Sequence, residues 1–357
     1  MEYDIAVVGG DGIGPEVTVE GLKVVTAVAE EFGFGLKLVE FPYCTQHFLD
    51  TGEILPDGAL DEFRQFQAIF LGAIGDPRVE VGLIERGIIA GVRFGLDLYI
   101  NLRPIKLYHE DFCPIKGKKP ADIDFVVVRE NTEDAYTGIG GILKRGTPDE
   151  VACQQMIYTR KGCERAIRYA FEYAVRRNGK KRLTLVDKAN AIRAQDIWTR
   201  TFAEVGEEFP EIERDHGYVD ATCMWMIKQP EFYDVMVTPN LFGDIITDLG
   251  AMLQGGMGIA ASGNIHPGQV SMFEPIHGSA PKYAGQNKAN PMGAIAAAQL
   301  MLDHIGEDAA AVCLEQAIAN LLGSGRIRSL SAGVHGTDEI GDLVVEEVRK
   351  LGRKGGA

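Results

Sequence analysis

Short apolar runs alternate along the chain with longer segments in which apolar residues recur at helical spacing. The run at 4–8 enters a glycine loop, and helical spacing follows from Pro15, a residue suited to a first helical turn. Further apolar runs predict strands at 68–72, 96–102, 124–129, 183–186 and 233–238. Helical patterns lie at 83–93, 164–177, 291–304, 309–322 and 338–351. Strands that alternate with helices predict an α/β fold with largely parallel pairing.

The length of 357 residues favours two domains over one. Between 106 and 122 the composition shifts to Lys, Pro and Gly, which predicts a crossing from one domain into the next. Residues 138–158 combine glycine turns with alternating polar and apolar positions. That segment is therefore expected to form an exposed β-arm.

Composition excludes several classes of protein. The longest apolar stretches, 68–74 and 292–302, are much shorter than a bilayer span of roughly 20 residues, so we expect no membrane segment. The net charge of −15 argues against nucleic acid as a partner, since phosphate binding needs a basic face. The 6 cysteines form no C-x-x-C pair, which argues against a zinc site or a disulfide framework. Acids at the start of the chain favour the cytoplasm over secretion.

Two carboxylates stand four residues apart in the stretch 240–248, directly after an apolar run. On a helix, Asp244 and Asp248 share one face. Such a pair can begin a Mg²⁺ site, which then needs a third ligand from elsewhere. The alternative is a solvated acidic face at a helix N-terminus. The spacing alone leaves both interpretations open.

The glycine loop after the first strand invites a dinucleotide-binding interpretation. The fingerprint G-x-G-x-x-G fails, however, because the third glycine position counted from Gly10 is Pro15. Glu40 ends the next strand-like run, at a place where a ribose-binding acid could lie. The pattern as a whole argues against an ordinary Rossmann site.

Arginines flank the predicted strands. Arg93 and Arg103 stand at the two ends of the strand expected at 96–102, and Arg129 ends the run at 124–129. Two neighbouring arginines can grip a carboxylate in fork geometry. Solvated surface charges are the simpler alternative, and the residues alone favour it.

Six motifs occur along the chain in a fixed order. They are Gly-Asp-Gly-Ile-Gly-Pro-Glu at 10–16, Asn-Leu-Arg-Pro at 101–104, Val-Arg-Glu at 128–130, Asp-Lys-Ala-Asn at 187–190, Asn-Leu-Phe-Gly-Asp at 240–244 and Phe-Glu-Pro-Ile-His-Gly-Ser-Ala-Pro at 273–281. Together they resemble the signatures of the β-decarboxylating dehydrogenases of malate-type substrates. This family comprises the 3-isopropylmalate, isocitrate, homoisocitrate and tartrate dehydrogenases, and the resemblance covers the chain from end to end.

The resemblance implies an isopropylmalate/isocitrate dehydrogenase-like two-domain fold with mixed, largely parallel sheets, distinct from the Rossmann fold. A large cofactor-binding domain is expected from 1–103 and 256–357, and a small dimerisation domain with the β-arm from 104–255. The family also implies a homodimer with shared active sites. In such a dimer Lys188 and Asp220 would reach into the partner subunit's site.

The resemblance also assigns chemical roles. Asp220, Asp244 and Asp248 would bind Mg²⁺ or Mn²⁺, and Arg93, Arg103 and Arg129 would bind substrate carboxylates, which reverses the simpler interpretation of the arginines. Oxidation of a secondary alcohol needs a base, for which Lys188 is the candidate, and Tyr136 would protonate the enol after decarboxylation. The alternatives are a salt bridge for Lys188 and a packed aromatic ring for Tyr136.

The segment before Arg93 is the family's specificity region, where isocitrate enzymes resemble one another in offering Ser and Asn. Here Ile88 and Ile89 begin an apolar run, which would bury an isopropyl group at roughly 0.8 kcal/mol per carbon and would penalise a third carboxylate. This favours 3-isopropylmalate, with isocitrate, homoisocitrate and tartrate- or malate-type substrates as alternatives. Arg86 stays unexplained, and as a nearby cation it keeps an acidic γ-group open as an alternative; residues 131–134 also resemble the isocitrate branch.

Cofactor contacts are also implied by the resemblance. The expected residues are Asn190, Glu274, His277, Gly278, Ser279, Ala280, Lys282, Tyr283 and Asn290. Lys282 and Tyr283 resemble the pair that meets the 2′-phosphate of NADP, whereas Ala289 resembles the NAD-type choice. We expect NAD, with NADP as the alternative. A non-catalytic regulatory subunit is a further alternative, disfavoured because the full set of site residues is present.

Overall fold

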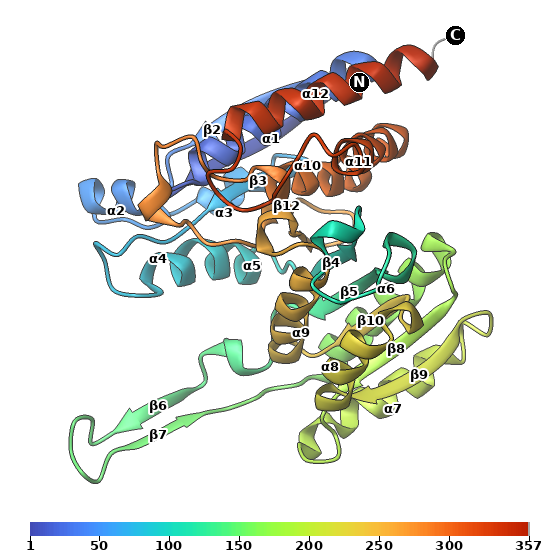
Figure 1. The fold of residues 1–357 in the computed structure, drawn as a ribbon. Coiled ribbons are helices and arrows are strands. Elements are labelled where there is room, and N and C mark those ends of the chain that lie inside the picture. The colour runs from blue at the N-terminus through green and yellow to red at the C-terminus, as the bar shows by residue number, and fades with distance from the viewer. Residues whose placement is uncertain (356–357) are drawn as a thin grey trace. The chain divides into compact units, whose positions relative to one another are not determined.

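A computed structural model describes residues 1–355 of the chain (Figure 1). The chain divides into two compact units, which are described separately. Unit 1 comprises 1–98, 106–121 and 251–357, and unit 2 comprises 99–105 and 122–250. Each unit is built around its own set of mainly parallel strands.

The strands of unit 1 follow the order β2-β1-β3-β12-β11. Their bounds are β1 Glu2–Gly10, β2 Gly35–Phe41, β3 Ala68–Ala73, β11 Ala261–Ile265 and β12 Ser271–Pro275. All neighbouring strands pair in parallel except β11 and β12, which are antiparallel. Strand β3 is buried at every position, as expected for a central parallel strand.

Four long helices cover the strands of unit 1 in Figure 1: α1 Gly14–Phe32, α10 Met292–His304, α11 Asp308–Gly323 and α12 Thr337–Gly355. Helix α1 packs against α10 and α12. It starts with Pro15 in its first turn and ends at Gly33, whose φ of 77° suits a glycine cap. Two shorter helices, α2 Thr45–Thr51 and α3 Ala59–Phe63, complete the connection to β3.

The segment 83–95 is less regular than the single helix expected at 83–93. It consists of α4 Leu83–Glu85, a π-helical turn at Arg86–Ala90 and α5 Gly91–Gly95. The strand expected at 96–102 is displaced to β4, Ile100–Lys106, because the N–H groups of Leu96 and Leu98 close the end of α5 on Val92 and Arg93. Arg103 therefore lies within a strand and not at its end.

The strands of unit 2 follow the order β4-β5-β10-β8-β9. Their bounds are β5 Asp124–Glu130, β8 Arg182–Asp187, β9 Glu213–Tyr218 and β10 Val235–Thr238, besides β4. From β5 to β9 the pairing is parallel. The helices are α6 Arg160–Arg177, α7 Asp196–Gly206, α8 Val219–Lys228 and α9 Asn240–Leu253.

An arm extends from the body of unit 2 (Figure 1). It is an antiparallel pair of strands, β6 Gly140–Leu143 and β7 Val151–Gln154, in which every residue is exposed. Its exposed apolar side chains include Ile142, Leu143 and Val151. The arm lies within the segment where the sequence predicts it.

The unit boundaries differ from the predicted domain boundaries at three places, one of which is the segment 251–255, assigned to unit 1. Residues 99–105 belong to unit 2, where the Asn131 N–H donates to the Tyr99 carbonyl at 3.0 Å. Residues 106–121 belong to unit 1, where the Lys106 N–H donates to Gln254 Oε1 at 2.8 Å. Hydrogen bonds between distant segments set these boundaries, and local composition does not reveal them.

Within the described residues, no helix is long and apolar enough to span a bilayer. The cytoplasmic location stays a prediction.

Short helical turns lie at Glu110–Phe112, Pro120–Asp122, Ala135–Thr137, Arg193–Gln195, Pro230–Phe232, Met257–Ile259 and Pro281–Tyr283.

Ile88 provides a test of the core beneath the segment 83–95, because its side chain is 1% exposed in a cluster with Ile84 and Val92. We expect Ile88→Ala to lower the free energy of unfolding by about 2–5 kcal/mol, since it removes buried methyl groups and leaves a cavity. Val312→Ala, at a side chain that is 64% exposed, serves as the control. Equal stability of the two variants in urea unfolding would contradict the placement of Ile88.

Candidate active site

Two acids and two arginines converge in unit 2. Asp244 and Asp248 lie one turn apart on α9, and their carboxylates are partly exposed. Arg103 on β4 lies 3.6 Å from Asp244 Oδ1 and 3.8 Å from Asp248 Oδ1. Arg129 on β5 also donates to Asp244 Oδ1. The tertiary structure therefore joins acids and arginines that the sequence keeps more than 100 residues apart.

Neighbouring polar groups fix both guanidinium groups. Arg103 donates from Nε to Asn101 Oδ1 and from Nη1 to Thr247 Oγ1, each at 2.6 Å. Arg129 is 2% exposed and donates from Nε to Asn240 Oδ1 at 2.9 Å. A Cβ on Gly243 would lie 2.5 Å from the Arg129 Cγ, so only glycine leaves room for this side chain. Asn240 and Gly243 thus explain part of the motif at 240–244.

Tyr136 completes this group. Its hydroxyl donates to Asp244 Oδ2 at 3.0 Å, and the guanidinium of Arg129 lies 5.3 Å from the ring centre. Burial and the neighbouring Asp244 raise the pKa of Tyr136, which favours the protonated phenol. The hydroxyl is therefore held as a proton donor beside the acids of α9.

The acids of α9 are suited to a hard cation but do not complete a site alone. Burial raises the pKa of Asp248, and the negative charge of Asp244 raises it as well. The nearby arginines lower this pKa, but by less. A divalent cation would offset both penalties and would accept carboxylate oxygens as ligands. Among residues 1–355, however, no three His, Cys, Asp or Glu side chains gather as a metal site. The described chain supplies two of the three predicted ligands to one place.

Lys188 and Asp220 form a separate pair in unit 2. Lys188 follows β8, Asp220 lies in the first turn of α8, and the Lys188 Nζ is 2.6 Å from Asp220 Oδ1. The hydrogen bond from Lys188 holds the pKa of Asp220 below its usual value. The Nζ atom also lies 5.9 Å from the ring centre of Tyr218. Lys188, the predicted base, and Asp220, the predicted third metal ligand, thus lie next to each other.

Arg93, the third predicted carboxylate ligand, lies in unit 1 on α5. Its Nη2 donates to Glu274 Oε1 at 2.8 Å, and the same oxygen accepts from Asn264 Nδ2 at 2.8 Å. Glu274 is only 5% exposed. The structure therefore places Glu274, a predicted cofactor contact, as the group that positions Arg93.

The glycine loop of unit 1 is built for close backbone contact. A Cβ on Gly10 would lie 2.1 Å from the Ala73 carbonyl oxygen, and one on Gly12 would lie 2.0 Å from the Ser279 carbonyl oxygen. Asp11 is buried and accepts from Thr45 and from the Gly75 N–H. The loop is thereby locked against the segment that contains Ser279.

The predicted cofactor residues at 274–290 share unit 1 with the glycine loop, whereas Asn190 is exposed in unit 2. Gly278 is exposed, and Ala280 adopts a left-handed φ of 38°. The buried Nε2 of His277 has no hydrogen-bond partner within the part of the chain described, and burial lowers the pKa of this imidazole.

Two other predicted cofactor contacts, Lys282 and Asn290, interact with neighbouring residues of the chain. Lys282 lies 4.7 Å from the ring centre of Tyr283. Asn290 is occupied at both ends of its amide, accepting from the Met292 N–H at 3.0 Å and donating to the Leu330 carbonyl at 3.1 Å. It stabilises the start of α10.

The two predicted specificity residues differ in exposure. Ile88 is 1% exposed in the core and offers no surface to a ligand in this conformation, whereas Ile89 packs against the same core and stays partly exposed. Arg86 lies 3.7 Å from Glu80 in an exposed ion pair. Ile89 is thus the accessible member of the apolar run.

The sequence did not single out several residues that shape the site. Asn101, Thr247 and Asn240 hold the arginines, although Asn101 and Asn240 stand within recognised motifs. Glu85 is a further residue that the sequence did not single out. A Cβ on Gly75 would lie 2.6 Å from its Oε1, so this carboxylate borders the glycine-loop region of unit 1.

Comparisons with known proteins cover nearly the whole chain. The family model described as isocitrate/isopropylmalate dehydrogenase matches residues 4–344. A 3-isopropylmalate dehydrogenase of Thermobifida fusca is 50% identical over 351 residues, which is 98% of each chain. One of Mycobacterium avium is 50% identical over 89% of this chain and 93% of the relative.

Solved structures are also similar over nearly the whole chain. An isocitrate dehydrogenase from Methylococcus capsulatus has a TM-score of 0.87 and 36% identity, covering 97% of this chain and 99% of its own. A β-decarboxylating dehydrogenase from Thermococcus kodakarensis has a TM-score of 0.79 and 32% identity, covering 98% and 96%.

Proposed function

Because the chain belongs to the isocitrate/isopropylmalate dehydrogenase family, we propose that it oxidises and decarboxylates 3-isopropylmalate, with reduction of NAD, in leucine biosynthesis. Relatives that are about half identical over nearly their full length bear that name. The observation that carries the proposal is the arrangement of Asp244 and Asp248 with Arg103, Arg129 and Tyr136 in unit 2. It unites anion-binding, cation-binding and proton-donating groups.

The arginines bind the two carboxylates of the substrate. Guanidinium groups suit this task because they stay charged and present paired donors. Arg103 and Arg129 are pre-positioned by Asn101, Thr247 and Asn240, so little side-chain entropy is lost on binding. Arg93, held by Glu274, provides the third guanidinium.

Lys188 and Tyr136 move the protons. Lys188 accepts the proton of the C2 hydroxyl while the hydride leaves C2 for the nicotinamide, which gives a β-keto acid. Loss of CO₂ leaves an enolate, and Tyr136 donates its hydroxyl proton to the former C3 carbon. The raised pKa of Tyr136 keeps that proton in place until the enolate forms.

Asp244 and Asp248, with Asp220 of the partner subunit, would hold Mg²⁺ or Mn²⁺. The two acids of α9 fit this role, since both have partly exposed side chains, and desolvation and the charge of Asp244 raise the pKa of Asp248. When bound, the ion supplies Lewis-acid stabilisation of negative charge on the substrate oxygens. The arginines beside the acids keep the apo site from accumulating uncompensated negative charge.

Ile89 contacts the isopropyl group of the substrate. Its side chain is the partly exposed part of the apolar run, and Ile88 supports it from the core. Three buried carbons at roughly 0.8 kcal/mol each favour an isopropyl group, whereas a charged γ-carboxylate would lose its hydration there.

NAD binds along the glycine loop and the segment 277–283 in unit 1. The closely packed glycines allow the backbone to approach a ligand, and the buried Nε2 of His277 is available for a hydrogen bond. Lys282 is exposed and stacked on Tyr283, so its charge alone does not select NADP.

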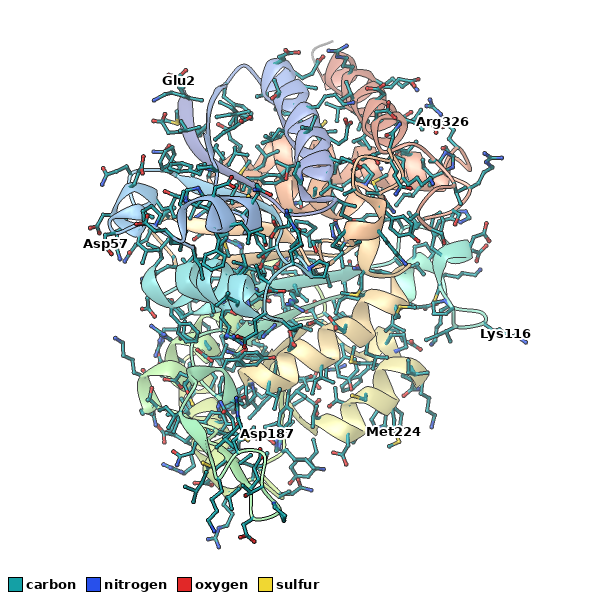
Figure 2. The ribbon with its side chains drawn as sticks, turned by 90° about the vertical axis from the view of Figure 1, so that its left-hand side faces the viewer. Glu2, Asp57, Lys116, Asp187, Met224 and Arg326 are labelled. Atoms are coloured by element: carbon teal, nitrogen blue, oxygen red, sulfur yellow. The ribbon has the colours of Figure 1, made fainter. Side chains whose placement is uncertain are left out.

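The active enzyme is a homodimer. On α8, Asp220 shares a stripe with Met224 and Ile227, which are 67% and 41% exposed; Met224 is labelled in Figure 2. On α9, Asp248 shares a stripe with Ile245 and Met252, which are 53% and 52% exposed. Burial of both stripes between two copies would bring Asp220 of one chain toward Asp248 of the other.

We expect the purified protein, with Mg²⁺ and NAD, to turn over 3-isopropylmalate with a higher kcat/KM than isocitrate, homoisocitrate, tartrate or malate. Ile89→Ala should lower kcat/KM for isopropylmalate by about 10-fold, because the contact with the side group is lost. NADP is assayed in parallel. Faster turnover of isocitrate would contradict the proposed substrate, and no turnover of any acid would favour a regulatory subunit.

Asp244→Asn and Asp248→Asn should abolish activity and weaken Mn²⁺ binding at least about 10-fold in calorimetry with isopropylmalate present. Binding is measured besides activity because both acids also contact arginines. Asp308→Asn, in the first turn of α11, is the matched control. Unchanged Mn²⁺ affinity in both α9 variants would rule out their role as ligands.

Met224→Glu should convert the dimer to inactive monomers in light scattering, because it places a charge in an apolar stripe, whereas Val312→Glu should not.

Mixed dimers test the shared site. Lys188→Ala and Asp244→Asn subunits, each inactive alone, should regain about a quarter of wild-type activity, because half of the dimers are mixed and each has one intact site. No recovery from confirmed mixed dimers would place each site within one chain.

A further inference from the structure

A buried acid lies next to Lys188 and is not used by the proposed mechanism. Asp187 ends β8 and is fully buried, and Figure 2 labels it in unit 2. Its Oδ1 accepts from the Ala189 N–H at 3.0 Å and lies 3.0 Å from His216 Nε2. Its Oδ2 is buried with no hydrogen-bond partner in the described chain. Within the described residues, His216 therefore makes the one side-chain hydrogen bond to this carboxylate.

A buried carboxylate with a single polar side-chain partner depends strongly on that partner. Removal of a paired charge leaves the full desolvation penalty on the group that remains. Asp187 also shapes the chain locally, because its bond to the Ala189 N–H closes the turn that carries Lys188. The N–H groups of Ala191 and Ile192 continue this turn by donating to the Lys188 carbonyl.

A second contact connects His216 to Lys188. The ring of Tyr218 packs edge-on against His216 with centroids 5.2 Å apart, and the Lys188 Nζ lies 5.9 Å from the same ring. His216 and Tyr218 both lie on β9, at alternate positions that share one face. The imidazole of His216 thus supports Lys188 in two ways: through Asp187, which closes the backbone turn of Lys188, and through the ring of Tyr218.

Resting on the proposed function of Lys188, we propose that His216 is a positioning residue for this base. Its imidazole holds Asp187, Asp187 holds the turn 187–189, and the turn and Tyr218 hold the Lys188 side chain beside Asp220. His216 touches no reacting atom in this scheme. It acts on the rate by keeping Lys188 in one place.

The charge of His216 strengthens this hold. The hydrogen bond with Asp187 raises the pKa of His216 above 6.5, although burial opposes the effect. The other titratable groups that face it are Asp215 and Tyr218 on its own strand and, across a cavity of about 390 Å³, Tyr233. The residues of α8 that line this cavity carry no charge. An imidazolium donates a stronger bond to a carboxylate than a neutral imidazole.

The sign of the pH dependence follows. Since the folded-state pKa of His216 is raised, the stabilisation is complete below the unfolded value near 6.5 and is lost as pH rises through the folded value. Protection of the turn 187–192 against hydrogen exchange, corrected for the intrinsic rate, should therefore decline as pH rises through the raised pKa of His216. His216→Gln should remove this decline, because an amide does not titrate.

The test compares His216→Ala, His216→Gln and the control His109→Gln, which changes a partly exposed histidine beside Asp111 in unit 1. We expect His216→Ala to lower kcat for isopropylmalate about 10- to 100-fold with KM nearly unchanged, as for other residues that orient a catalytic group. Exchange of the peptide covering 187–192 should rise at least about 5-fold. The amide of His216→Gln can still donate to Asp187 and should restore most of both.

Each outcome decides the role. Control-like kcat and exchange in His216→Ala would overturn it, as would a fall in kcat without faster exchange, or faster exchange at normal kcat. Should His216→Ala not fold, Asp187→Ala replaces it with the same expected results, because it removes the oxygen that accepts from the Ala189 N–H and pairs with His216. A wild-type protein that oxidises none of the acids would count against the proposed function. The hydrogen-exchange measurement would then still test whether His216 stabilises the turn 187–192.

Discussion

The charge balance around α9 is the constraint on which unit 2 depends. Two carboxylates one helical turn apart repel one another, and Asp248 is also partly buried. Arg103 and Arg129 offset this repulsion from two neighbouring strands, so the same contacts that neutralise the acids hold β4 and β5 to α9. Arg129 is itself buried, so the loss of its ion pair with Asp244 would be costly. Structure and chemistry therefore rest on one set of ion pairs.

Asp220 and Asp248 share helix faces with apolar residues, and this would connect the proposed dimer to the proposed metal site. A stripe that exposes Met224 and Ile227 to water gains free energy by burial, and Asp220 lies on that stripe. The same holds for Asp248 with Ile245 and Met252 on α9. An incomplete set of metal ligands in one chain is the expected result of such an arrangement. Association would supply the apolar partner and the missing carboxylate in one step.

Lys188, the proposed base, illustrates how a side chain can depend on neighbours that have no proposed contact with the substrate. Its pair with Asp220 fixes the end of the side chain, whereas Asp187 and His216 fix its backbone turn. Arg93 and Glu274 repeat this principle in unit 1, and Asn101 and Asn240 repeat it for the other arginines. In each case a polar side chain holds a residue for which a role in the site is proposed.

The sequence by itself determined the α/β class, the family and the shared face of Asp244 and Asp248, because these depend on local periodicity and on contiguous motifs. It did not distinguish Ile88 from Ile89, since a π-helical turn changes which side chain meets the core. It also missed β9, whose charged residues suit an edge strand and give no apolar signal. Only the tertiary structure decided which arginine meets which acid and that His216 meets Asp187. Those pairs join segments far apart in the chain, and local pattern holds no information about where the chain returns.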